Sequence, residues 1–126
     1  MKILVIDDSS LQRKLIGQII RKAGFDNEIL EAGDGQQAIQ LLGINFSEIG
    51  LILCDWNMPN MTGAQFLEGV AKVPQVAKIP FFMVTSEGTE ARIKEAYEKH
   101  PLLTGYIVKP FTPDQLREKI EPVLKK

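Results

Sequence analysis

The 126-residue sequence has one cysteine, Cys54, one histidine, His100, and one tryptophan, Trp56. One cysteine cannot form a disulfide within the chain, which excludes disulfide-stapled folds and fits the reducing conditions of the cytoplasm. We therefore expect Cys54 to be a small buried apolar residue. His100 precedes Pro101, and this pair predicts a surface turn rather than a catalytic or metal-binding histidine.

The sequence also lacks an excess of charge and any long apolar run. Its 15 basic and 16 acidic residues give a net charge of −1, so it has no basic field of the kind that binds nucleic acid. No apolar run approaches the length of a membrane span. The apolar run 3–6 ends in two aspartates instead of a signal-peptide cleavage site. We expect one cytoplasmic domain over residues 1–126, with no nucleic-acid or membrane partner.

Short apolar segments alternate with segments of helical periodicity along the chain. The apolar segments do not alternate between polar and apolar residues, which is typical of parallel strands buried on both faces. Strands are expected at 3–6, 28–32, 51–54, 81–84 and 106–108. Helices are expected around 11–23, 38–42, 66–70, 93–97 and 113–124. This order predicts an α/β domain with a parallel sheet and right-handed crossovers.

Residues that start and stop helices support these boundaries. Ser9 or Ser10, Thr89 and Thr112 precede helical segments and can accept hydrogen bonds from the first free N–H groups. Pro113 suits the first position of the last helix. Gly24 follows the first helical segment as a stop signal.

Reactive side chains follow four of the five predicted strands. These are Asp7 and Asp8 after the first strand, Asp55 after the third, Thr85 after the fourth and Lys109 after the fifth. In open α/β sheets ligands bind beyond the carboxyl ends of the strands, so we expect these groups to converge. Carboxylates about 4 Å apart repel by roughly 4 kcal/mol per pair at an effective dielectric of about 20. A hard cation such as Mg²⁺, together with Lys109, would offset that repulsion.

This arrangement suits phosphoryl chemistry. A carboxylate fixed at a strand end, as expected for Asp55, can act as a nucleophile towards phosphorus. A hydroxyl and an ammonium group beside a metal form a cradle for a phosphoryl group. Each residue alone has an ordinary explanation: a helix cap for Asp7 or Asp8, a turn residue for Asp55, a strand-end residue for Thr85 and a solvated amine for Lys109. The combination is much harder to explain in that way.

Four segments resemble the motifs of a known family. They are "VIDDSS" (5–10), "CDWNMPNMTG" (54–63), "MVTSE" (83–87) and "YIVKPF" (106–111), in order over nearly the whole chain. Together they resemble the response-regulator receiver domain, and within that family the single-domain, CheY-like chemotaxis regulators. The resemblance implies a doubly wound, flavodoxin-like fold: a five-stranded parallel sheet of order 2-1-3-4-5, flanked by five helices.

The resemblance also implies roles for the site residues. Asp55 would accept a phosphoryl group from the phosphohistidine of a CheA-like histidine kinase. Asp8, Asp55 and the backbone carbonyl of Asn57 would hold Mg²⁺, with Asp7 acting through water. Lys109 would contact the phosphoryl group. Beyond assisting its own phosphorylation and dephosphorylation, such a protein is not an enzyme.

For signal output, the resemblance implies a two-state switch. Thr85 would move towards the phosphoryl group and Tyr106 would move inward, while Asn57 and Glu87 would tune dephosphorylation. The peptide between Lys109 and Pro110 is expected to be cis. The output partner, such as a flagellar-motor switch component, would bind the fourth helix, fifth strand and last helix, and a phosphatase is a further possible partner. Expected contacts on that face are Ala91, Lys94, Glu95, Tyr106 and Lys119.

Three other functions fit these residues less well. A phosphohydrolase of the haloacid-dehalogenase type also forms a phosphoaspartate, but it needs a second acid where this chain has Asn57. A flavodoxin-like cofactor binder needs a phosphate loop after the first strand, where "DDSS" is too acidic. An adaptor that has lost phosphorylation is disfavoured because every site residue is present. One departure from the family is the segment 97–105, which is slightly longer than usual and puts the shape of the output face in question.

Overall fold

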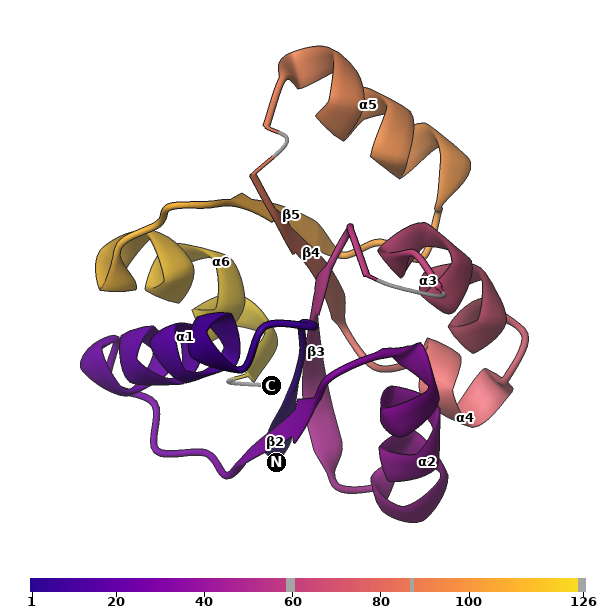
Figure 1. The fold of residues 1–126 in the computed structure, drawn as a ribbon, viewed down its shortest axis with the longest axis horizontal. Helices are drawn as coiled ribbons and strands as arrows, with labels where there is room; N and C mark the ends of the chain where they lie inside the picture. Colours follow the sequence, from indigo (N-terminus) through magenta and orange to yellow (C-terminus); the bar gives the residue numbers. More distant parts are fainter. Residues whose placement is uncertain (59–60, 87, 125–126) are drawn as a thin grey trace.

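The computed structural model describes residues 1–58, 61–86 and 88–124 of the chain. Strands and helices alternate through this part of the protein, except that two helices lie between the third and fourth strands (Figure 1). The strands are β1 (Lys2–Ile6), β2 (Ile29–Ala32), β3 (Ile49–Asp55), β4 (Phe81–Thr85) and β5 (Gly105–Val108). The helices are α1 (Ser10–Lys22), α2 (Gly35–Asn45), α3 (Gly63–Ala71), α4 (Pro74–Ala77), α5 (Glu90–Lys99) and α6 (Pro113–Leu124).

The five strands form one parallel sheet of order β2-β1-β3-β4-β5, which confirms the predicted fold class. Helices α1 and α6 lie on one face, and α2, α3 and α4 lie on the other (Figure 1). Because both faces are covered, side chains of either direction along β1, β3 and β4 are buried. This accounts for the lack of alternation in the strand sequences.

Each face of the sheet has its own apolar core. The core under α1 and α6 includes Ile16, Ile20, Leu116 and Ile120 packed on strand residues. The core on the opposite face includes Phe66 and Leu67 of α3, Ala38 and Leu42 of α2, and Ala96 of α5. Each of these residues is at least 95% buried, so the apolar periodicity of the helical segments marks the surface that contacts the sheet.

The structure has one helix more than expected in the part of the chain it describes. Helix α4 has only four residues, starts at Pro74, and buries Val76. A single helical turn is too short to show apolar periodicity in the sequence, so this helix had no recognisable signal. The expectation of five helices was therefore wrong by this turn, while all five predicted strands are present within one or two residues of their expected bounds.

The predicted helix ends are confirmed. The hydroxyl of Ser9 accepts the N–H of Gln12 at 3.2 Å, and Thr89 and Thr112 cap α5 and α6 in the same way. Gly24 has φ of 99°, a left-handed conformation that glycine adopts without steric cost. No helix in the described ranges is both long and apolar enough to cross a membrane.

His100 contradicts its sequence-based prediction. It is only 6% exposed, and its ring meets the ring of Trp56 edge-on, with centroids 6.2 Å apart. The residue ends α5, where its N–H donates to the carbonyl of Ala96, and the imidazole is buried against Trp56 instead of lying in an exposed turn. A lone histidine before proline gives no local signal of such a long-range aromatic contact.

Candidate functional site

The acidic site lies where the two central strands end. β1 and β3 are neighbours, with Ile6 opposite Cys54, so the residues that follow Ile6 meet Asp55 at the same edge of the sheet. Carboxylate oxygens of Asp7, Asp8 and Asp55 lie within 4.8 Å of one another. The structure therefore brings together the three acids that the sequence assigned to one cluster.

Asp7 is the buried member of the cluster, at 1% exposure. One of its carboxylate oxygens accepts the N–H of Ser9 at 2.9 Å. The other accepts a hydrogen bond from Nζ of Lys109 at 3.0 Å. Both oxygens thus have partners, as expected for a buried carboxylate. Asp8 is exposed and Asp55 is half-buried, so the carboxylates of these two residues are the ones that solvent can reach.

Lys109, the residue after the edge strand β5, provides positive charge at the site. Its Nζ is 3.9 Å from an oxygen of Asp55 as well as 3.0 Å from Asp7. The expected cis peptide between Lys109 and Pro110 is present. The main-chain N–H of Lys109 donates to the carbonyl of Thr85 at 2.8 Å, which ties the ends of β4 and β5 together beside the site.

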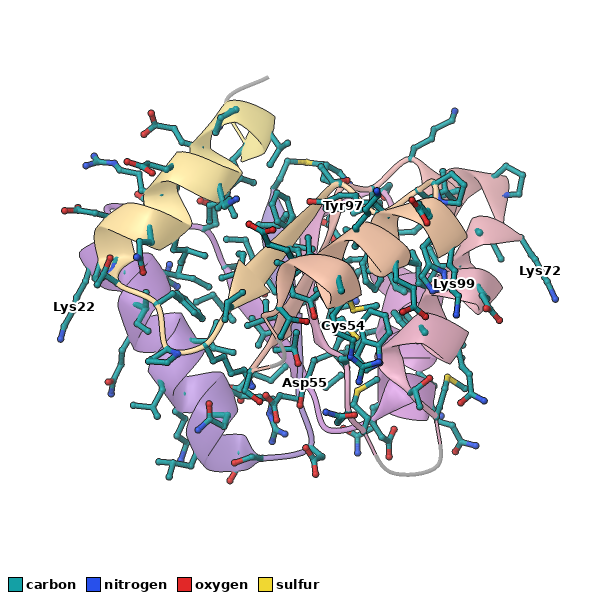
Figure 2. The ribbon with its side chains drawn as sticks, turned by 90° about the horizontal axis from the view of Figure 1, so that it is seen from above. Lys22, Cys54, Asp55, Lys72, Tyr97 and Lys99 are labelled. Carbon is teal, nitrogen blue, oxygen red and sulfur yellow. The ribbon has the colours of Figure 1, made fainter. Side chains whose placement is uncertain are left out.

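Asp55 holds its carboxylate at the end of a buried strand, next to the fully buried Cys54 and below it in the view of Figure 2. Burial raises the pKa of Asp55 above its usual value. The nearby ammonium of Lys109 opposes this shift, the charges of Asp7 and Asp8 add to it, and a hydrogen bond from the backbone N–H of Asn57 lowers the pKa. The raised pKa shows that this carboxylate carries charge that its protein environment compensates only in part.

Cys54 behaves as the sequence predicted. Its side chain is buried among apolar residues of the sheet. Burial raises the pKa of its thiol well above the usual value, and the charges of Asp55 and Asp7 raise it further. The thiol therefore stays protonated and fills space.

The donor set fits a hard divalent cation. Three carboxylates converge with one ammonium group, so the cluster carries uncompensated negative charge. Its ligand atoms are all oxygens, and two of the three carboxylates are accessible. Mg²⁺ favours one or two carboxylates with additional water. The residues present therefore match the predicted Mg²⁺ site in charge, atom type and accessibility.

The remaining predicted site residues lie on adjoining elements. Thr85 ends β4 and is fully buried. Its neighbour Val84 stands opposite Asp55 in the sheet, which puts Thr85 one residue further along the same edge. Asn57 is exposed in the loop after β3. Glu87 lies outside the described residues.

The predicted output face is only partly as expected. Ala91, Lys94 and Glu95 on α5 and Lys119 on α6 are exposed. Tyr106 is only 5% exposed, and its ring lies 6.4 Å from that of Trp56. The expectation that Tyr106 offers a surface contact is wrong for this conformation, because the aromatic ring packs inward between Trp56 and the core.

Sequence reasoning missed Arg13. The Nη1 of this residue donates to the main-chain carbonyl of Asp7 at 2.5 Å, and its Nε donates to Glu31 at 2.9 Å. Arg13 is four residues after the cap residue Ser9, so it returns to the loop one helical turn later. That spacing was the available signal, but the acceptor is a main-chain atom that the sequence does not distinguish.

Comparison with known proteins agrees with this geometry. The family model for the response regulator receiver domain matches residues 3–121. A chemotaxis protein CheY homolog of Campylobacter jejuni is 40% identical over 98% of this chain and 92% of its own length. The chemotaxis protein CheY of Pseudomonas aeruginosa is 39% identical over 100% and 98%.

Solved structures of similar fold include chemotaxis proteins and response regulators. The chemotaxis protein CheY4 of Vibrio cholerae superposes with a TM-score of 0.81 at 31% identity, over 97% of each chain. A putative response regulator of Chloroflexus aurantiacus has a TM-score of 0.85 over 99% and 98% of the two chains, and at 24% identity supports the fold alone. With a family match over almost its full length and these CheY relatives, the chain belongs to the response regulator receiver domain family, in its CheY-type chemotaxis branch.

Proposed function

We propose that this protein is a phosphorylation-activated switch in which Asp55 is the phosphoryl acceptor. The observation that carries the proposal is the convergence of three carboxylates and one ammonium at a single edge of the sheet. Of the three acids, Asp55 alone ends a central strand and remains accessible beside Lys109. It is therefore the acid best fixed in direction for attack on phosphorus.

The reaction is a transfer between two nucleophiles. A carboxylate oxygen of Asp55 bonds to the phosphorus of a phosphohistidine on a histidine kinase of the CheA type. The P–N bond breaks, and the imidazole leaves with its electron pair and takes up a proton. Attack of water on the phosphorus later releases inorganic phosphate and restores the Asp55 carboxylate. A phosphatase would act on this second step, with Asn57 and Glu87 influencing its rate.

The protein's own residues have separate tasks in this scheme. Asp8, Asp55 and the carbonyl of Asn57 would hold Mg²⁺, and Asp7 would act through water. When bound, the cation would neutralise charge that builds up on the phosphoryl oxygens. Lys109 binds the phosphoryl group with its ammonium, and the hydroxyl of Thr85 donates to it. The fully buried position of Thr85 means that its movement disturbs the packing around β4.

The output surface in this proposal is formed by α5, β5 and α6. Phosphorylation adds up to two negative charges beside Lys109 and Thr85, both of which join the site to the ends of β4 and β5. The exposed residues Lys94, Glu95 and Lys119 are the proposed contacts for an output protein such as a flagellar-motor switch component. The single-domain organisation and cytoplasmic location expected from the sequence are part of the same proposal.

Intact-mass spectrometry with acetyl phosphate as the small phosphodonor tests this function. With Mg²⁺, the wild-type protein is expected to gain the mass of one phosphoryl group, and hydroxylamine should remove it, as it does from acyl phosphates. Without Mg²⁺ the gain should be absent or much slower. Equal gain in the presence of EDTA, or a product stable to hydroxylamine, would contradict the proposed chemistry.

A further inference from the structure

A hydrogen-bonded arginine lies behind the acidic cluster and has no part in the chemistry described above. Arg13 is on the first turns of α1, and its side chain is only 17% exposed. Its Nη1 donates to the main-chain carbonyl of Asp7 at 2.5 Å. Its Nε donates at 2.9 Å to a carboxylate oxygen of Glu31, on the edge strand β2.

The carbonyl that accepts the hydrogen bond from Arg13 belongs to a peptide next to the metal-site residues. The carbonyl of Asp7 is part of the peptide bond that leads directly into Asp8. The N–H of Asp7 is also held, since it donates to the carbonyl of Ala32 at the end of β2 at 3.1 Å. The main chain of Asp7 is therefore fixed on both sides by contacts to β2, one direct and one through Arg13 and Glu31.

The two carboxylates of this pair are restrained differently. The side chain of Asp7 is held by Ser9 and Lys109, whereas Asp8 is exposed. The direction in which Asp8 leaves the backbone depends on the orientation of the peptide plane before it. A planar guanidinium group that bonds two acceptors at fixed angles can set that plane, whereas a lysine ammonium cannot hold both in the same geometry.

We propose that Arg13 is a positioning residue for the metal site: by clamping the Asp7–Asp8 peptide to Glu31, it orients the Asp8 carboxylate towards the cation. The inference rests on the proposed function, because it concerns the Mg²⁺ site described there. Partners that orient metal ligands from behind commonly change metal affinity by about 10- to 100-fold.

Simple electrostatics predicts the opposite sign, which makes the proposal testable. Replacing Arg13 by alanine removes a positive charge near three carboxylates and leaves Glu31 without its ion pair. On charge alone, that change attracts Mg²⁺ more strongly. If Arg13 acts by positioning, Arg13→Ala instead weakens Mg²⁺ binding by about tenfold. Arg13→Lys retains the charge but not the planar fork, so it should also weaken binding.

A matched control is available at the other end of the same helix. Nη1 of Arg21 donates to the carbonyls of Phe25 and Asn27 at 3.0 and 2.7 Å, so it too fastens a loop after its element. Arg21→Ala removes the same chemical group and the same kind of bond far from the acids. Its effect on thermal unfolding measures the structural contribution of such a clamp without any change at the metal site.

The experiment is titration of the metal-free wild type and the three variants with MgCl₂, followed by calorimetry and by the fluorescence of Trp56. The expected result is a dissociation constant raised about tenfold in Arg13→Ala and clearly raised in Arg13→Lys, with Arg21→Ala equal to wild type. Unchanged or tighter binding by Arg13→Ala, full recovery in Arg13→Lys, or equal weakening in Arg21→Ala would overturn the positioning role. If Arg13→Ala does not fold, the Arg13→Lys comparison decides. Absence of Mg²⁺ binding by the wild type would instead refute the proposed function, and the positioning role with it.

Discussion

Nζ of Lys109 lies 3.0 Å from a carboxylate oxygen of Asp7, although the two residues are 102 positions apart in the chain. This contact joins the loop after β1 to the loop after β5, across two intervening strands of the sheet. It gives the buried Asp7 carboxylate its charged partner. Because the same ammonium lies 3.9 Å from Asp55, it links the stability of the metal-free fold to the charge of the site.

Lys109→Ala should therefore destabilise the metal-free protein by about 1–3 kcal/mol, because it leaves Asp7 buried without its cation. Addition of Mg²⁺ should reduce the difference, since a bound cation supplies positive charge to the same acids. Lys99→Ala is the matched control: it breaks an exposed pair with Glu95, which contributes little to stability because solvent screens the two charges. Urea unfolding in EDTA and in MgCl₂ measures the change in free energy of unfolding for each substitution. An equally small change for both would contradict the claim that Lys109 stabilises the buried Asp7 carboxylate.

Asp55→Asn should stabilise the metal-free protein at neutral pH. Burial raises the pKa of Asp55 above its ordinary value of 3.8. Between pH 3.8 and the raised pKa, the folded state therefore binds more protons than the unfolded state. Wild-type stability contributed by this group is present below pH 3.8 and falls as pH rises through the raised pKa. The variant has a neutral side chain at this position, so its stability does not decrease in this way.

Thermal unfolding of both proteins in EDTA across pH 3–8 measures this difference. The melting temperatures of the two proteins should be similar near pH 3 and should separate as pH rises. Each kcal/mol by which the variant is more stable than wild type should raise its melting temperature by roughly 4 °C. Asp26→Asn, which changes an exposed acid, is the control and should follow wild type. A less stable Asp55→Asn at pH 7 would show that the carboxylate is better compensated than its burial implies.

Two glycines of α3 should respond in opposite ways to alanine. A Cβ at Gly63 would lie 2.5 Å from the main-chain oxygen of Asp55 and 3.0 Å from Cα of Trp56. The loop after Asp55 would have to shift, at a cost of about 1–3 kcal/mol. A Cβ at Gly69 meets no atom within 4 Å, so Gly69→Ala should stabilise the helix by roughly 0.5–1 kcal/mol.

Chemical denaturation gives these two free energies of unfolding, and Mg²⁺ titration adds a functional readout. Gly63→Ala should also weaken Mg²⁺ binding, because it moves the backbone that carries Asp55 and Asn57. Gly69→Ala should leave the affinity unchanged. The close-packing argument fails if both substitutions prove equally mild.

The phosphoryl mimic beryllofluoride, with Mg²⁺, should shift backbone amide signals in α5, β5 and α6 as well as in the metal site. We expect the structural change to begin at Thr85 and Lys109, because these residues are hydrogen-bonded to each other at the ends of β4 and β5. Thr85→Ala should confine the shifts to the metal site, while amides of α2 serve as an internal reference in both proteins. Shifts that never reach Tyr106 in the wild type would show that the switch does not act on this surface.

The sequence predicted the parts of this molecule that have a local or periodic signature. The strands after which Asp7, Asp55 and Thr85 stand are continuous apolar runs, and parallel topology then forces their ends to one edge. Ser9, Thr89 and Thr112 were predictable as caps because the chemistry of an N-cap is local. Three features lacked such a signature. Helix α4 is a single turn, the buried His100 contacts Trp56, and Tyr106 packs inward beside the same tryptophan.

The most direct test of the account is to locate the phosphorylated residue. After reaction with acetyl phosphate and Mg²⁺, borohydride reduces an acyl phosphate to an alcohol, which marks the modified aspartate as homoserine for peptide mass spectrometry. The account predicts homoserine at residue 55 alone, and none in Asp55→Asn treated identically. Homoserine at residue 7 or 8 of the wild type, or an unmodified Asp55 in protein that has gained the phosphoryl mass, would contradict it.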